Sequence, residues 1–127
     1  MPLRIVPDEG KPSAAIEIPL EKPLPDYDLD QIEQPTPRDV DAVLVSQGFR
    51  DLVDDARGVL TDLLSHSGLE IAQLTGAICP GDDEVYRPGL WIIVRDPHAN
   101  PKASLAIETE ARIAKTAREL SERLGLS

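Results

Sequence analysis

Aromatic side chains are scarce in this sequence of 127 residues. The complete set is Tyr27, Phe49, Tyr86 and Trp91, so any core has to be built from Leu, Ile, Val and Ala. Proteins that bind single-stranded nucleic acid stack the bases on aromatic side chains. The composition therefore argues against that kind of binding.

Cysteine and long hydrophobic runs are also nearly absent. Cys79 is the single cysteine, which excludes a disulfide within the chain and suits a reducing compartment. It fits a small buried apolar residue better than a nucleophile. The longest strongly apolar run, residues 90–94, is far shorter than a membrane span, and the N-terminus lacks the apolar stretch of a secretory signal. We therefore expect a cytoplasmic protein without membrane contact.

Positive charge is in short supply. The chain has 13 Lys and Arg against 23 Asp and Glu, for a net charge of −10. Nucleic-acid affinity depends on Lys and Arg that neutralise phosphates, so direct binding to nucleic acid is not expected. The sequence also lacks a glycine-rich phosphate loop and a zinc-spaced Cys/His cluster. The charge favours a more basic protein as the partner, or a divalent cation.

Proline, by contrast, is abundant at one end. Eight of the twelve prolines fall within residues 1–37. Closely spaced prolines block helices and remove backbone hydrogen-bond donors. We therefore predict an extended, proline-rich acidic arm over residues 1–36, followed by one domain over residues 37–127.

Part of this arm is apolar. Ile16, Ile18 and Leu20 alternate with other residues and would share one face of an extended chain. Pro19 confines such a strand to the edge of a sheet. Two interpretations remain open: a disordered tail, or an arm whose apolar face docks on a neighbouring domain or subunit.

The domain begins with a helical pattern. Apolar residues recur with helical period over residues 42–64, after a cap-plus-proline pair at 36–37. Gly48 weakens this helix and is the point at which it could divide. The same start signal precedes a last helix, which we predict over residues 100–124.

Two strands are predicted between these helices, at residues 69–79 and 90–94, joined as an antiparallel hairpin by an acidic loop. An isolated hairpin is marginal and its edges invite pairing. The expected fold class is therefore α+β, in the order arm, helix(-helix), strand, strand, helix. It has two layers, and its small antiparallel sheet is completed by the arm or by dimerisation.

A chemical site is one alternative. Adjacent carboxylates can ligate Mg²⁺ or Mn²⁺, and Asp96 and His98, just past the second strand, are expected near the same end of the hairpin as the acidic loop. The candidate ligands are Asp82, Asp83, Glu84, Asp96 and His98. The simpler interpretation is that these acids keep a surface turn solvated.

The sequence favours a non-enzymatic role. We expect a regulatory or accessory protein that binds a more basic protein through its acidic surface and its arm, with no cofactor and with self-association as an option. The expected partner-binding residues are Ile16, Ile18, Leu20, Asp26, Asp28, Asp30 and Glu33. The alternatives are a divalent-metal-dependent hydrolase or nuclease that uses the loop at 82–84, and a mimic of nucleic acid.

Overall fold

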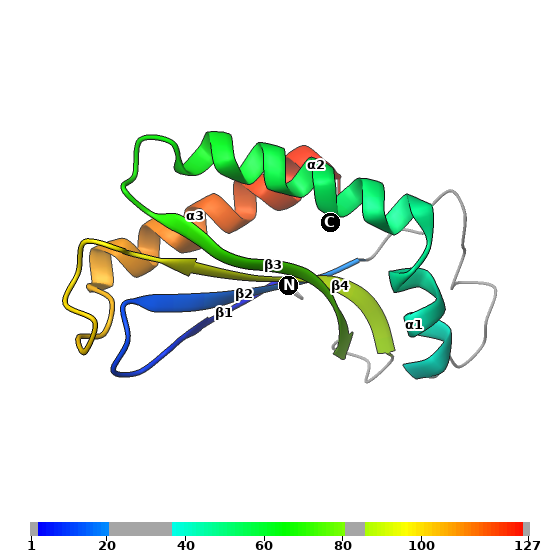
Figure 1. Cartoon of the computed structure of the whole chain (residues 1–127), viewed down its shortest axis with the longest axis horizontal. Coiled ribbons are helices and arrows are strands. Elements are labelled where there is room, and N and C mark those ends of the chain that lie inside the picture. Colours follow the sequence, from blue (N-terminus) through cyan, green and yellow to red (C-terminus); the bar gives the residue numbers. More distant parts are fainter. Residues whose placement is uncertain (1–2, 21–36, 81–85, 126–127) are drawn as a thin grey trace.

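The computed structural model describes residues 3–20, 37–80 and 86–125. These residues form four strands and three helices (Figure 1). In chain order they are β1 (Arg4–Pro7), β2 (Ser13–Pro19), α1 (Pro37–Leu44), α2 (Gln47–Leu64), β3 (Glu70–Pro80), β4 (Tyr86–Arg95) and α3 (Ile107–Leu124).

The four strands form one antiparallel sheet in the order β1-β2-β4-β3. Helices α2 and α3 lie side by side over one face of the sheet, and α1 lies at the end where β3 and β4 bend (Figure 1). The α+β class expected from the sequence is confirmed. None of the described helices is long and apolar enough to cross a membrane.

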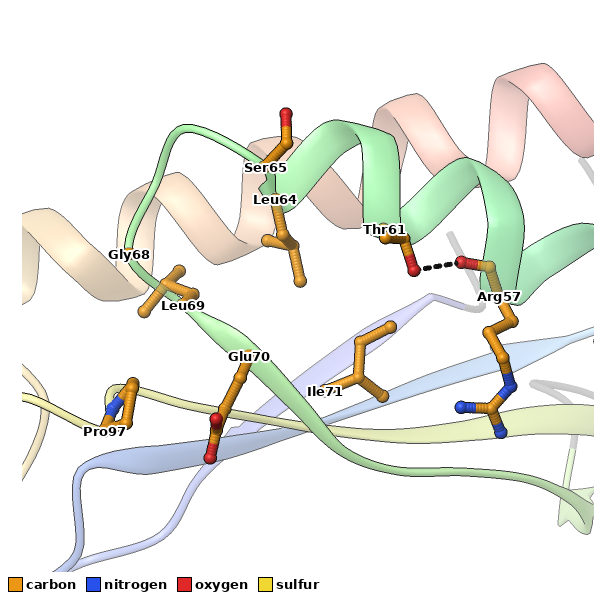
Figure 2. Close-up of a pocket in the computed structure, with 9 residues that line it drawn as sticks. All are labelled: Arg57, Thr61, Leu64, Ser65, Gly68, Leu69, Glu70, Ile71 and Pro97. Carbon is orange, nitrogen blue, oxygen red and sulfur yellow. Dashed lines mark hydrogen bonds between the residues drawn. The ribbon is translucent and has the colours of Figure 1, made fainter.

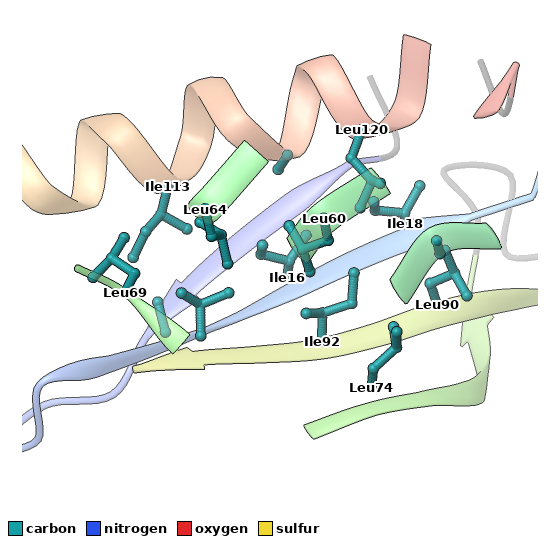
Figure 3. Close-up of a cluster of buried hydrophobic side chains, with 14 of the residues drawn as sticks. Ile16, Ile18, Leu60, Leu64, Leu69, Leu74, Leu90, Ile92, Ile113 and Leu120 are labelled. Atoms are coloured by element: carbon teal, nitrogen blue, oxygen red, sulfur yellow. The ribbon is translucent and has the colours of Figure 1, made fainter. Parts of the chain in front are cut away.

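The core lies between the sheet and the two long helices. Side chains from β2, β4, α2 and α3 meet there and are almost fully buried (Figure 3). Burial of this aliphatic surface is the main source of folding free energy. Representative members are Ile16, Ile18, Leu60, Leu90, Ile92, Ile113 and Leu120.

Strand β2 lies inside the sheet, between β1 and β4, so the prediction that Pro19 confines it to an edge is wrong. The Leu20 amide donates to the Pro88 carbonyl of β4 at 2.9 Å. Because successive residues of a strand direct their backbone groups to opposite sides, the Pro19 nitrogen points toward the β1 side. The β1 ladder reaches only the pair Arg4↔Glu17. Within the described residues, therefore, no ladder bond is lost at Pro19.

The same alternation fixes the orientation of β4. The Asp96 amide donates to the Pro12 carbonyl at 2.9 Å, and the Pro88 carbonyl accepts from Leu20. The even-numbered residues of β4 therefore direct their backbone groups toward β2. Its odd-numbered residues direct them toward β3.

Two helix boundaries differ from the predictions. The helical stripe divides at Ser46, whose hydroxyl oxygen accepts from the Phe49 amide at 3.3 Å and donates to the Val43 carbonyl at 2.6 Å. Gly48 lies in the first turn of α2 instead. The last helix begins at Ile107, because the Asn100 side chain accepts from the Lys102 amide at 3.0 Å and closes a turn there.

The sheet face turned away from α2 and α3 is mixed in character. Ala15, Trp91 and Ile93 are partly buried on this face. Arg4 pairs with Glu17 at 2.8 Å on the same side of the sheet.

Candidate binding groove between α2 and β3

The apolar residues that the sequence assigned to partner binding lie in the core. Ile16, Ile18 and Leu20 are 0%, 2% and 5% exposed and pack within the hydrophobic cluster that α2 and α3 help to form. Their side chains are covered by the chain itself. The acidic members of that set, Asp26, Asp28, Asp30 and Glu33, lie outside the described residues.

The proposed metal ligands are divided in the same way. Asp82, Asp83 and Glu84 lie outside the described residues, so the metal site stays a prediction. The prediction that Asp96 and His98 lie near the loop end of the hairpin is wrong, because they follow the pair Glu70↔Arg95, whereas the pair Pro80↔Tyr86 lies at the opposite end of β3 and β4. There an Asp96 carboxylate oxygen accepts from the His98 backbone amide at 3.0 Å. This bond closes a turn. Over residues 3–20, 37–80 and 86–125, no group of three or more His, Cys, Asp or Glu side chains is arranged to hold a metal ion.

Cys79 is buried on β3, with 1% of its surface exposed. The pKa of its thiol is raised from 9.0 to about 12, chiefly by burial and also by the charge of Glu17 and a hydrogen bond to the same carboxylate. Arg4 opposes this effect. The thiol therefore stays protonated at neutral pH, and a protonated thiol is neither a nucleophile nor a metal ligand.

A surface groove of about 510 Å³ lies between the second half of α2 and the start of β3 (Figure 2). Its floor is apolar and its rim is polar. The lining residues are Arg57, Thr61, Leu64, Ser65, Gly68, Leu69, Glu70, Ile71 and Pro97.

The turn between α2 and β3 shapes one end of the groove. The Ser67 hydroxyl donates to the Leu64 carbonyl at 2.8 Å and accepts from the Leu69 amide at 3.1 Å. Gly68 takes a φ of +76°, a backbone conformation that glycine adopts at no steric cost. The chain thus reverses tightly, and Leu69 and Ile71 return beside the last turns of α2 (Figure 2).

The outer edge of β3 lies next to this groove. Gln73 and Thr75 pair with odd-numbered residues of β4, so the backbone N–H and C=O of the intervening Leu74 point away from the sheet. The ladder also contains a bulge between Ile71 and Gln73. Within the described ranges no strand pairs with this edge. Exposed edges of this kind accept further strands.

The two charged side chains that line the groove, Glu70 and Arg57, differ in whether they have an ion-pair partner. Glu70 accepts from the Arg95 guanidinium across the β3–β4 pair. The Arg57 side chain reaches from α2 toward the level of the strands, with Ile71 lying between it and Glu70 (Figure 2). Among the described residues no carboxylate lies within ion-pair distance of Arg57. As far as the described residues go, its guanidinium has room for an external acceptor.

The groove is not visible in the sequence pattern. Ser67 and Gly68 mark the end of a helix, and Leu64 and Leu69 read as core positions. The local sequence pattern does not indicate that Arg57 and Ile71 line one groove, because their proximity depends on how α2 crosses the sheet. Comparisons with protein-family models, curated proteins and solved structures give no match for this chain.

Proposed function

We propose that this chain is a non-enzymatic accessory or regulatory protein that binds a more basic protein partner in the cytoplasm. The observation that carries the proposal is the groove of about 510 Å³ beside the outer edge of β3, with which no strand of the described residues pairs. Grooves beside a sheet edge suit recognition of another polypeptide, because the edge supplies backbone hydrogen bonds and the groove supplies selectivity.

The charge of the molecule supports a basic partner. Asp54, Asp55 and Asp62 are exposed on α2, close to the groove. The sequence places a further net charge of −4 in residues 21–36 and −3 in residues 81–85. A field of one sign steers an oppositely charged partner toward the surface and speeds association.

The test blocks the groove without touching the core. Thr61 is exposed on α2 and lines the groove, so Thr61→Trp fills it. Ala111 is exposed on α3 and is not part of the groove, so Ala111→Trp is the matched control. The tagged full chain is used to capture partners from a native extract, and the intact mass of each complex gives partner and stoichiometry.

We expect a partner of higher isoelectric point to be retained by the wild type and by Ala111→Trp, and lost with Thr61→Trp. Its association rate should fall as salt is raised, because screening weakens charge attraction beyond about 8–10 Å. Equal capture by all three proteins, or a partner that is acidic, would contradict the proposal.

A further inference from the structure

We infer that the groove holds an extended segment of the partner, which pairs with β3 as an additional strand. One apolar side chain of that segment lies on Leu64, Leu69 and Ile71, and a carboxylate two residues away pairs with Arg57. This inference rests on the proposed function and names the ligand that the groove takes.

The backbone geometry favours an extended ligand. Leu74 directs its N–H and C=O away from β4, no strand of the described residues pairs with them, and the neighbouring residues Ala72 and Gln73 are exposed. A helical segment satisfies its own backbone groups and gains nothing from such an edge. A strand gains ladder hydrogen bonds along it.

The floor of the groove favours an apolar side chain. Leu64 is 5% exposed and Leu69 is 9% exposed, and Ile71 is partly buried beside them. An aliphatic side chain laid on these three residues removes its own apolar surface, and that of Ile71, from water; Leu64 and Leu69 are already nearly covered and supply an apolar contact. Thr61 and Ser65 line the groove from α2 above this floor (Figure 2).

Arg57 favours a carboxylate as the third feature of the ligand, after the extended backbone and the apolar side chain. Its guanidinium lies beyond Ile71 when the groove is followed from Leu69 (Figure 2). Side chains at alternate positions of a strand share one face and lie about 7 Å apart, so a residue two positions from the apolar one reaches the Arg57 end. Guanidinium pairs with carboxylate in a bidentate manner that lysine cannot reproduce.

A local carboxylate is compatible with a partner that is basic overall. Arg57 would form a short-range ion pair with one carboxylate of the ligand, whereas Asp54, Asp55 and Asp62 make the surrounding surface negative and attract a basic partner at longer range. A second copy of this chain is a less favourable occupant, because two molecules of net charge −10 repel each other.

The test selects ligands from displayed random linear peptides, using the full chain and two charge-reversal variants. Arg57→Glu changes the groove. Arg118→Glu makes the same change on the exposed side of α3, away from the groove, and is the matched control.

The wild type and Arg118→Glu should select an apolar residue and an acidic residue separated by one position. Arg57→Glu should bind those peptides about tenfold more weakly or worse and should select Lys or Arg in place of the acid. N-methylation of alternate backbone amides of a selected peptide should abolish binding, and methylation of the other amides should not, because only one set faces β3.

Peptides that bind in the groove without an acidic preference, or that tolerate both methylation patterns, would overturn the inference and leave the proposed function standing. Peptide binding that survives Thr61→Trp would overturn the groove itself and with it the proposed function. A wild-type dimer that Thr61→Trp converts to a monomer would show that a second copy is the occupant, and this too overturns the inference.

Discussion

Gly89 is a position of β4 at which a Cβ atom has no room. A Cβ atom there would lie 2.5 Å from the Cys79 Sγ and 2.8 Å from the Ile18 carbonyl oxygen. Real Cβ atoms do not approach a backbone oxygen so closely, and the strand pairs Ile18↔Leu90 and Ala77↔Gly89 hold these atoms in place. Side chains larger than hydrogen are therefore excluded at this position.

We predict that Gly89→Ala lowers the free energy of unfolding by about 1–3 kcal/mol or more, since overpacking in a well-ordered core costs that amount. Urea denaturation measures the change. Gly58 is the control, because a Cβ there meets nothing within 4 Å and the residue lies within α2. Gly58→Ala should raise stability by about 0.5–1 kcal/mol. Equal effects at the two glycines would show that Gly89 is not constrained as described.

The buried thiol of Cys79 predicts a dependence of stability on alkaline pH. Its pKa is about 12 in the folded protein, against 9.0 when unperturbed. Between these values the unfolded state loses the proton and the folded state retains it, so stability falls as pH rises. The loss attributable to Cys79 is about 1.4 kcal/mol at pH 10.

Unfolding free energies at pH 8 and pH 10 test this prediction for the wild type and Cys79→Ala. The alanine variant lacks the thiol and should show a smaller decrease over this range, whatever its stability at pH 8. Other groups titrate equally in both proteins, so the difference between the two decreases isolates the thiol. Identical decreases would place the pKa of Cys79 near its ordinary value.

At the scale of elements, α2 and α3 begin differently. Ser46 caps α2 with its hydroxyl, whereas Ala106, in the same position before α3, has an extended backbone and no side-chain cap. The first amides of a helix have no partner within the helix. A hydroxyl at the cap supplies one.

We predict that Ser46→Ala lowers, and Ala106→Ser raises, the free energy of unfolding by about 1 kcal/mol each. Thermal or urea denaturation measures both changes. The two sites are on different helices, so the double variant should return close to the wild-type stability. If Ala106→Ser has no effect, the first turn of α3 does not have the geometry described.

The sequence patterns predict elements better than they predict arrangement. The apolar stripe of α2 and the run at 90–94 are strong enough to identify a helix and a strand. The division at Ser46 depends on one hydroxyl, which donates one hydrogen bond and accepts another. The presence of Gly48 two residues later does not predict it. The late start of α3 depends on the Asn100 turn, which mimics a helix cap in sequence.

The position of β2 is harder still to predict. In the local sequence Pro19 indicates an edge strand. The structure meets the same chemical constraint differently, because in the described residues β1 begins at Arg4, opposite Glu17, and its ladder does not reach Pro19. The groove is harder for a similar reason. Arg57 and Ile71 become neighbours of one cavity only through the crossing of α2 over β3. Local sequence patterns do not indicate which residues from distant segments become neighbours in the fold.

At the scale of the molecule, the first and last parts of the chain share one core. Strand β2, from the segment predicted to be an arm, contributes Ile16 and Ile18 to the same cluster as Ile113 and Leu120 of α3. Its removal would expose one edge of β4 and the apolar faces of both long helices. The core then loses a central layer of side chains.

We therefore predict that residues 37–127 alone lose cooperative unfolding, as measured by circular dichroism during urea titration. Supplying residues 1–20 as a separate peptide should restore the transition in proportion to its concentration, since binding of the peptide favours the folded state. A sharp unfolding transition without the peptide would show that these residues build a core without β2.

The pairing of β2 with β4 also determines when the protein can finish folding. A ribosome releases β2 well before β4, its central partner, has been translated, so the apolar side of β2 stays uncovered for most of synthesis. Contacts between segments so distant in sequence form slowly. The next stretch to emerge, residues 21–36, carries a net charge of −4, and repulsion between such stretches keeps nascent chains apart during that interval.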